Sequence, residues 1–389
     1  MQLLICLHNN SLLQPLGFFN TKLSTTMAAP VDGSSDHLFT FPRGDVDIKV
    51  TYKDREIKGK VNGQALIMAS PVWQKFVSPP WKTVGEPKIT AIDFSGDDGA
   101  ALLILLRISH LQLFHIPKIV DLMTAYNIAV LCEQYDCVHL LSPWIEEWLK
   151  ALKSSREHSS IHAAQERKAY IYWAFGDLRE FRSSALSMVK NTRMLPLSQN
   201  ELSLCRDILP ERLYENIKTI RESTLQKLLN LPYTEIDKYF RNFVCPMVRP
   251  PICEVSNRSC DIHVYGSLTL ELGGLGLWPQ KSAKAVWESV QFVENYLTQF
   301  SIPRFPQQSH ELDDHEACGG MSYDHDVSNI MSNIEDPTEE CHIRHMKLRK
   351  GATIPEGNTS STYLQCVRCN TSHSTAQECP PNPRKRPAE

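Results

Sequence analysis

Two closely spaced pairs of histidine and cysteine lie in the C-terminal third of the chain. His315 and Cys318 are separated by two residues, and Cys341 and His345 follow with three residues between them. Imidazole and thiolate are the usual ligands of Zn²⁺, and two such pairs can complete a tetrahedral site. Four protein ligands leave no position for water, so this zinc would be structural. His342 is a competing ligand, and the alternative is that these side chains are solvated in a polar loop.

A second cysteine group is a weaker candidate metal site, and the catalytic motifs that we sought do not occur in the sequence. Cys366 and Cys369 form a knuckle spacing, with His373 and Cys379 as further ligands, but they lie among Asn, Ser, Thr and Pro, so this second metal site is the weaker hypothesis. The glycines at 273–276 lack the preceding strand and following helix of a phosphate loop, and no nucleophile elbow occurs. We therefore predict that the protein is not an enzyme.

The elements expected to position these residues begin with an alternating segment. Residues 46–50 alternate as in a half-buried strand, and the chain returns as a second strand over 56–60. Residues 65–69 predict a short apolar helix that ends at Ser70. Pro71 cannot donate a backbone hydrogen bond, but it suits the first position of a new helix with Ser70 as its cap.

Further elements follow in a regular order. Residues 88–94 alternate as a strand, and Asp97 and Asp98 stand at the start of a leucine-rich helix. A closing helix is expected from Trp144 to about Lys150. Between them, a helical stripe predicts one buried face, formed by Ile119, Leu122, Met123, Tyr126 and Val130.

This order, with the Ser70-Pro71 break and the Gln134-Tyr135-Asp136 turn, resembles a BTB/POZ domain over 39–152. The resemblance implies an α+β fold that binds other proteins, usually a second copy of itself, so we expect a homo-oligomer. It also implies that an apolar group at the start of the domain lies where family dimers pair, formed by Leu38, Phe39 and Phe41. The function would then reside in surfaces rather than in a catalytic pocket.

Two departures from the family limit what the resemblance implies. Many BTB domains carry His at the position of Asn62 and a basic residue at that of Gly63, which forms a corepressor groove with the residue equivalent to Asp45; corepressor binding is therefore not expected here. Cullin-binding relatives have a hydrophobic-x-Glu signature in the loop that here spans 111–117, where this chain has no Glu. We expect weak cullin binding, and a cullin ubiquitin-ligase adaptor remains an alternative function.

The chain beyond residue 152 is predicted to be helical. A helix over 161–175 should end at Gly176, the capping spacing from Asp177 to Glu180 begins another, and further helices follow Leu213. Val286, Val290, Val293 and Leu297 stripe the last one. With Trp173-Ala174-Phe175-Gly176-Asp177 and Gly276-Leu277-Trp278-Pro279, this half resembles filamentous-fungal BTB proteins. We place the helical C-terminal domain at 153–345.

Composition and the two ends of the chain set the remaining expectations. With 41 basic and 44 acidic residues the chain is nearly neutral, so we expect neither a nucleic-acid nor a membrane partner. Residues 1–38 are expected to be a flexible leader, because the apolar run at 3–7 is too short for a secretory signal. Twelve dispersed cysteines indicate a reducing compartment, nuclear or cytoplasmic.

The polar C-terminal segment is predicted to be disordered. From about residue 335 it has few bulky apolar side chains, and we place a disordered tail at 346–389. Its basic run at 384–386 is either a short nuclear import signal or a solvated terminus. A zinc-containing nuclear regulator is therefore a further alternative function.

Overall fold

A small sheet and its covering helices form the N-terminal part of the computed structural model. The structure describes residues 37–79, 91–154, 161–195, 201–244, 250–253, 256–302, 321–350, 364–365 and 372–373. Strand β1 (Val46–Tyr52) pairs antiparallel with β2 (Arg55–Val61) and parallel with β3 (Ala91–Phe94), giving the order β2-β1-β3. The predicted hairpin is confirmed. Lys53 and Asp54 both adopt positive φ at its turn, the conformation that matches the twist of the paired strands.

Short helices connect and cover this sheet, and we call residues 37–154 the sheet unit. The helices are α1 (Gly63–Ala69), α2 (Pro71–Val77), α3 (Gly99–Ser109), η3 (Leu113–His115), α4 (Leu122–Tyr135), η4 (Val138–Leu141) and α5 (Ile145–Ser154). The predicted break at Ser70 is confirmed. Its hydroxyl accepts hydrogen bonds from the backbone N–H groups of Val72 and Trp73, and it donates one to the carbonyl of Tyr135. One buried hydroxyl thus joins α2 to the end of α4.

Two expectations about exposed and buried faces were wrong. Phe39 is fully buried and Phe41 is 3% exposed. They cannot form an open pairing surface, because Phe39 packs against Gly59 and the ring of Phe41 stacks on His110. The stripe predicted on the next helix also fails in part. Ile119 is 70% exposed, because Asp121 caps α4 and places Ile119 outside the helix. Met123 lies in the first turn of α4 and is 46% exposed.

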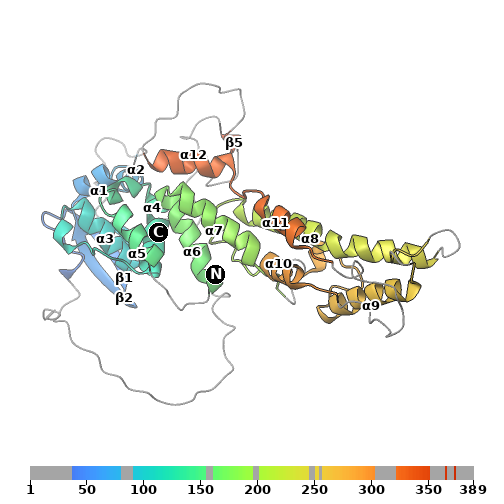
Figure 1. Cartoon of the computed structure of the whole chain (residues 1–389). Coiled ribbons are helices and arrows are strands. Elements are labelled where there is room, and N and C mark those ends of the chain that lie inside the picture. The colour runs from blue at the N-terminus through green and yellow to red at the C-terminus, as the bar shows by residue number, and fades with distance from the viewer. Residues whose placement is uncertain are drawn as a thin grey trace, which may run out of the picture.

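The helical region begins with a pair packed on the sheet unit and continues into an arm. Its helices are α6 (Ile161–Phe175), α7 (Leu178–Asn191), α8 (Leu213–Val244), α9 (Arg258–Gly274), η5 (Ala283–Ala285), α10 (Val290–Gln299), α11 (Asp324–Ser332) and α12 (Glu340–Arg349). Figure 1 shows α8 running from the body of the molecule into the arm, where α9, α10 and α11 lie alongside it. The predicted stop of α6 is confirmed, because Gly176 has φ +80°, and Asp177 accepts the capping hydrogen bond of α7.

The buried apolar residues form two cores that α8 joins. The first includes the sheet unit, α6, α7, the start of α8 and Met346 of α12, and the second includes the rest of α8 with α9, α10 and α11. The first core continues across the boundary expected at 152–153. Within the described ranges no helix is long and apolar enough to cross a membrane.

The C-terminal segment has more structure than its composition predicts. The expectation of disorder from about 335 was wrong for α12, which continues past residue 345 to Arg349. Beyond it, β4 (Leu364–Gln365) pairs antiparallel with β5 (Ser372–His373). The composition of this segment does not predict α12, because the helix is stabilised by contacts with distant parts of the chain rather than by a large apolar content of its own. Met346, for example, is 1% exposed within the first core.

Candidate interaction surfaces

An anchored segment of the sheet unit presents apolar side chains to solvent. Five of the exposed large apolar side chains in the described ranges fall between residues 111 and 123, namely Leu111, Leu113, Phe114, Ile119 and Met123. We call this the 111–123 surface. Ile116 and Val120 point inward and are 7% and 6% exposed, and the indole of Trp148 donates to the carbonyl of Pro117. The segment is therefore fixed from below while Phe114, with a relative exposure of 104%, is open to solvent.

Asp45, Asn62 and Gly63, which occupy the positions of the corepressor groove in the family, have a structural role here. Asp45 accepts a 2.7 Å hydrogen bond from the backbone N–H of Gly63, and the Asn62 side chain caps α1 through the N–H of Ala65. A Cβ atom at Gly63 would lie 3.1 Å from a methyl of Val46. Asp45 thus fixes the start of a helix instead of facing a basic side chain from position 63.

The structure describes two of the four proposed zinc ligands. His315 and Cys318 lie outside the described residues, whereas Cys341 and His345 are one turn apart on α12. Cys341 is exposed, with Sγ 3.7 Å from Oε2 of Glu339. Among the residues that the structure describes, no group of three or more His, Cys, Asp or Glu side chains is arranged to hold a metal. The four-ligand site therefore stays a prediction.

His342, the competing ligand, is fully engaged with protein atoms. Its Nδ1 accepts from the backbone N–H of Glu339 at 3.0 Å, and its Nε2 lies 2.8 Å from the carbonyl oxygen of Glu211, to which it donates. Burial lowers the pKa of His342 below its usual value, which keeps the ring neutral. Most of the second candidate metal group lies outside the described residues, namely Cys366, Cys369 and Cys379, and its remaining member His373 belongs to β5.

A charged and aromatic surface that sequence reasoning missed holds α12. The guanidinium of Arg349 pairs with Asp136 at 2.5 Å and with both carboxylate oxygens of Glu133 at 3.1 Å. His345 stacks on Trp173 with ring centroids 4.0 Å apart. We call Glu133 and Asp136 of the sheet unit, with Trp173 of α6, the α12 docking surface. Arg349 and Asp136 are 213 residues apart in sequence. No local sequence pattern could therefore reveal this docking surface.

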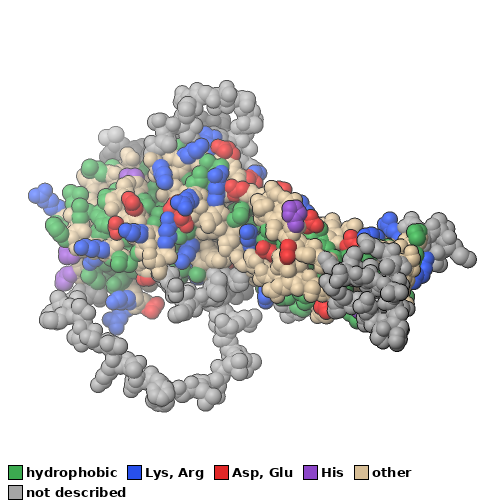
Figure 2. Space-filling view, in the orientation of Figure 1, with side chains coloured by type: hydrophobic (Ala, Val, Ile, Leu, Met, Phe, Trp, Pro, Cys, Tyr) green, Lys and Arg blue, Asp and Glu red, His purple; other side chains and the backbone are tan. Residues whose placement is uncertain are grey.

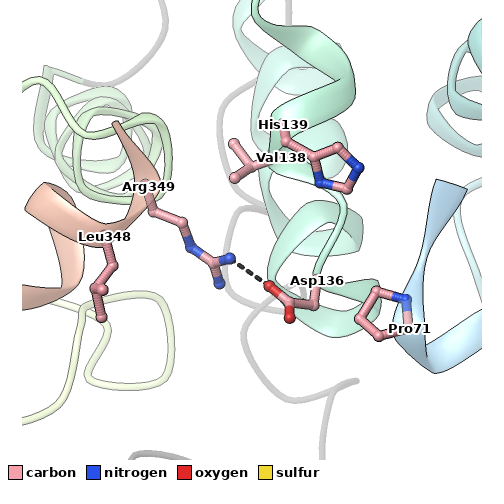
Figure 3. Close-up of a pocket in the computed structure, with 6 residues that line it drawn as sticks. All are labelled: Pro71, Asp136, Val138, His139, Leu348 and Arg349. Atoms are coloured by element: carbon pink, nitrogen blue, oxygen red, sulfur yellow. Dashed lines mark hydrogen bonds and ion pairs between the residues drawn. The ribbon is translucent and has the colours of Figure 1, made fainter. Parts of the chain in front are cut away.

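Open grooves lie beside the C-terminal end of α12. A cavity of about 360 Å³ is lined by Pro71, Asp136, Val138 and His139 on one side and by Leu348 and Arg349 on the other (Figure 3). A neighbouring cavity of about 480 Å³ shares His139 and Arg349 and reaches α5 and Phe175. Figure 2 shows acidic and basic side chains interspersed over the body of the molecule, with hydrophobic side chains gathered at the end formed by the sheet unit.

Comparison of the chain with protein-family models and with curated proteins gives no match.

Proposed function

We propose that the protein is a non-enzymatic interaction protein, in which the sheet unit is a BTB/POZ domain that associates with a second copy or with another protein. The single observation that carries the proposal is the 111–123 surface, a fixed segment with five exposed apolar side chains. The order of strands and helices and the buried Ser70 cap are consistent with that domain type. Exposed apolar patches mark interaction sites, and these five side chains lie in one short segment.

The size of the surface favours modest affinity. Complete burial of one large apolar side chain contributes about 1.5–3 kcal/mol, so Leu111 and Phe114 together would supply about 3–6 kcal/mol. Association of two proteins costs an estimated 4–15 kcal/mol in lost freedom before any contact is counted. These two residues offset at most the lower end of that cost, so we expect the remaining side chains of the 111–123 surface to contribute. We therefore expect modest affinity and test for association at micromolar concentrations.

Light scattering after size-exclusion chromatography tests self-association directly. The full chain at micromolar concentrations should give a mass above that of the monomer, and the double substitution Leu113→Gln with Phe114→Gln should return it to the monomer mass. Leu270→Gln is the matched control, because Leu270 is 77% exposed but lies on α9 in the arm. A monomeric wild-type chain at these concentrations would exclude self-association and leave only the binding of another protein.

A cullin ubiquitin-ligase adaptor is the second candidate function, favoured by the full exposure of Phe114. The loop at 111–117 offers this hydrophobic group but no Glu. Loss of a hydrogen bond to a charged group costs about 1.5–3 kcal/mol, which is about one to two decades in affinity. We expect weak or no binding of the full chain to a cullin N-terminal domain by calorimetry. Nanomolar binding would contradict this expectation and make the adaptor the better assignment.

A further inference from the structure

Helix α12 is held mainly by polar contacts to segments distant in sequence. Of its ten residues only His342 and Met346 are buried, and His345 adds its stack on Trp173. The hydrophobic effect therefore holds the helix through few side chains. Arg349 supplies the ion pairs to α4, and at the other end Glu339 pairs with Arg212 at 3.1 Å. Segments with few buried apolar contacts are those in which local opening is usually observed.

One ion pair between α12 and its docking surface lacks a hydrogen bond. Oε1 of Glu133 and Nε2 of His345 are both buried and lie 3.3 Å apart, yet neither atom takes part in a hydrogen bond. Oε1 of Glu133 has the Arg349 guanidinium 3.1 Å away as an ion-pair partner, but the carboxylate could still accept from a better placed donor. A Lys or Arg side chain in place of the imidazole would supply that donor, because a charged donor makes the stronger hydrogen bond.

The docking surface also extends further than α12. The grooves of about 360 and 480 Å³ continue from Arg349 along α2, η4 and α5, with Leu348 at their edge and 55% exposed (Figure 3). A helix longer than α12 could place apolar side chains there while its basic residues reach Glu133 and Asp136. Charge complementarity therefore selects a basic partner, and the flanking groove selects an amphipathic one.

We propose that α12 is a displaceable intramolecular occupant of a docking surface that receives a basic amphipathic helix from a partner protein. The bound α12 blocks Glu133, Asp136 and Trp173, and its release opens them. This interaction lies apart from the 111–123 surface and does not depend on self-association.

Reversal of one charge tests the proposal in the full chain. Arg349→Glu places a carboxylate against Glu133 and Asp136, and amide hydrogen exchange along α12 should then accelerate at least tenfold. A fluorescent peptide of residues 338–351, kept with reductant and chelator, should bind this variant at least tenfold more tightly than it binds the wild type. Arg344→Glu is the matched control, because Arg344 is exposed on the same helix and undergoes the same charge change; it should behave as the wild type.

Three results would overturn the proposal. The first is wild-type exchange of α12 in Arg349→Glu; the second is faster exchange without any gain in peptide binding; the third is equal binding of a peptide that itself carries Arg349→Glu. Where circular dichroism shows that Arg349→Glu loses its fold, Arg349→Gln takes its place with the same measurements, because it removes the ion pairs without adding repulsion.

Discussion

Substitution of Ser70 by alanine should weaken the first core more than an ordinary helix cap would. The hydroxyl of Ser70 is completely buried and makes three hydrogen bonds. Two of them satisfy N–H groups at the start of α2, and the third satisfies the carbonyl of Tyr135, at the end of α4, where helix carbonyls lack partners within the helix. Ser70→Ala removes all three and offers no replacement.

The expected magnitude follows from these two roles. Loss of a helix N-cap costs about 0.5–2 kcal/mol, and a buried carbonyl left without a donor costs about 1–3 kcal/mol. The free energy of unfolding of the first core should therefore fall by about 1.5–5 kcal/mol. Ser289→Ala is the matched control, because Ser289 is buried and caps α10 through the N–H of Phe292. That residue has only the capping role, so its loss should cost about 0.5–2 kcal/mol.

Native-state hydrogen exchange separates the two cores. Amides of α3 and α4 report the first core, and amides of α9 and α10 report the second. Ser70→Ala should lower the opening free energy of the first set more than Ser289→Ala lowers that of the second. A loss below about 0.5 kcal/mol at α3 and α4 would mean that Ser70 is not the link between α2 and α4.

Two further predictions concern Glu166 and the zinc ligands. Burial raises the pKa of Glu166 to about 7, above its unfolded value of about 4.3. The stabilising contribution of the protonated carboxyl is therefore complete below pH about 4.3 and is lost progressively as the pH rises from there through about 7. Glu166→Gln should raise the thermal unfolding midpoint at pH 8 but much less at pH 4, and an equal shift at both would contradict the assignment. For zinc, the purified full chain should contain about one equivalent and Cys318→Ser should lose it. Less than about 0.2 equivalents in the wild type, from cells supplied with zinc, would leave these residues as polar loop positions.

The features predicted correctly from sequence are those that depend on neighbouring residues. The β1–β2 hairpin follows from the alternation of its strands, whereas the turn itself lies at Lys53 and Asp54, both with positive φ. The Ser70 cap follows from a hydroxyl before Pro71, and the end of α6 follows from Gly176. In each case the backbone conformation is dictated within a few residues, so a pattern in the sequence is sufficient.

The failures arise where burial depends on packing partners that the sequence does not reveal. No local sequence pattern around Phe39 and Phe41 distinguishes an exposed dimer edge from a core position. Their burial results from packing against Gly59 and His110, which are distant in sequence. Ile119 fits a helical stripe by spacing alone. The Asp121 cap excludes it from α4 and leaves it on the 111–123 surface, so that error in a core prediction identifies a candidate interaction residue.

Helix α12 was misread for the opposite reason, because it has little apolar content and composition alone predicts disorder. Its position depends on Glu133 and Asp136, which belong to a helix formed far earlier in the chain, and on the ring of Trp173. A segment that owes its order to such partners gains little from burial of its own. The same scarcity of apolar contacts that hid α12 from sequence analysis is the reason why we propose it, among the elements of the first core, as the one that a basic helix displaces.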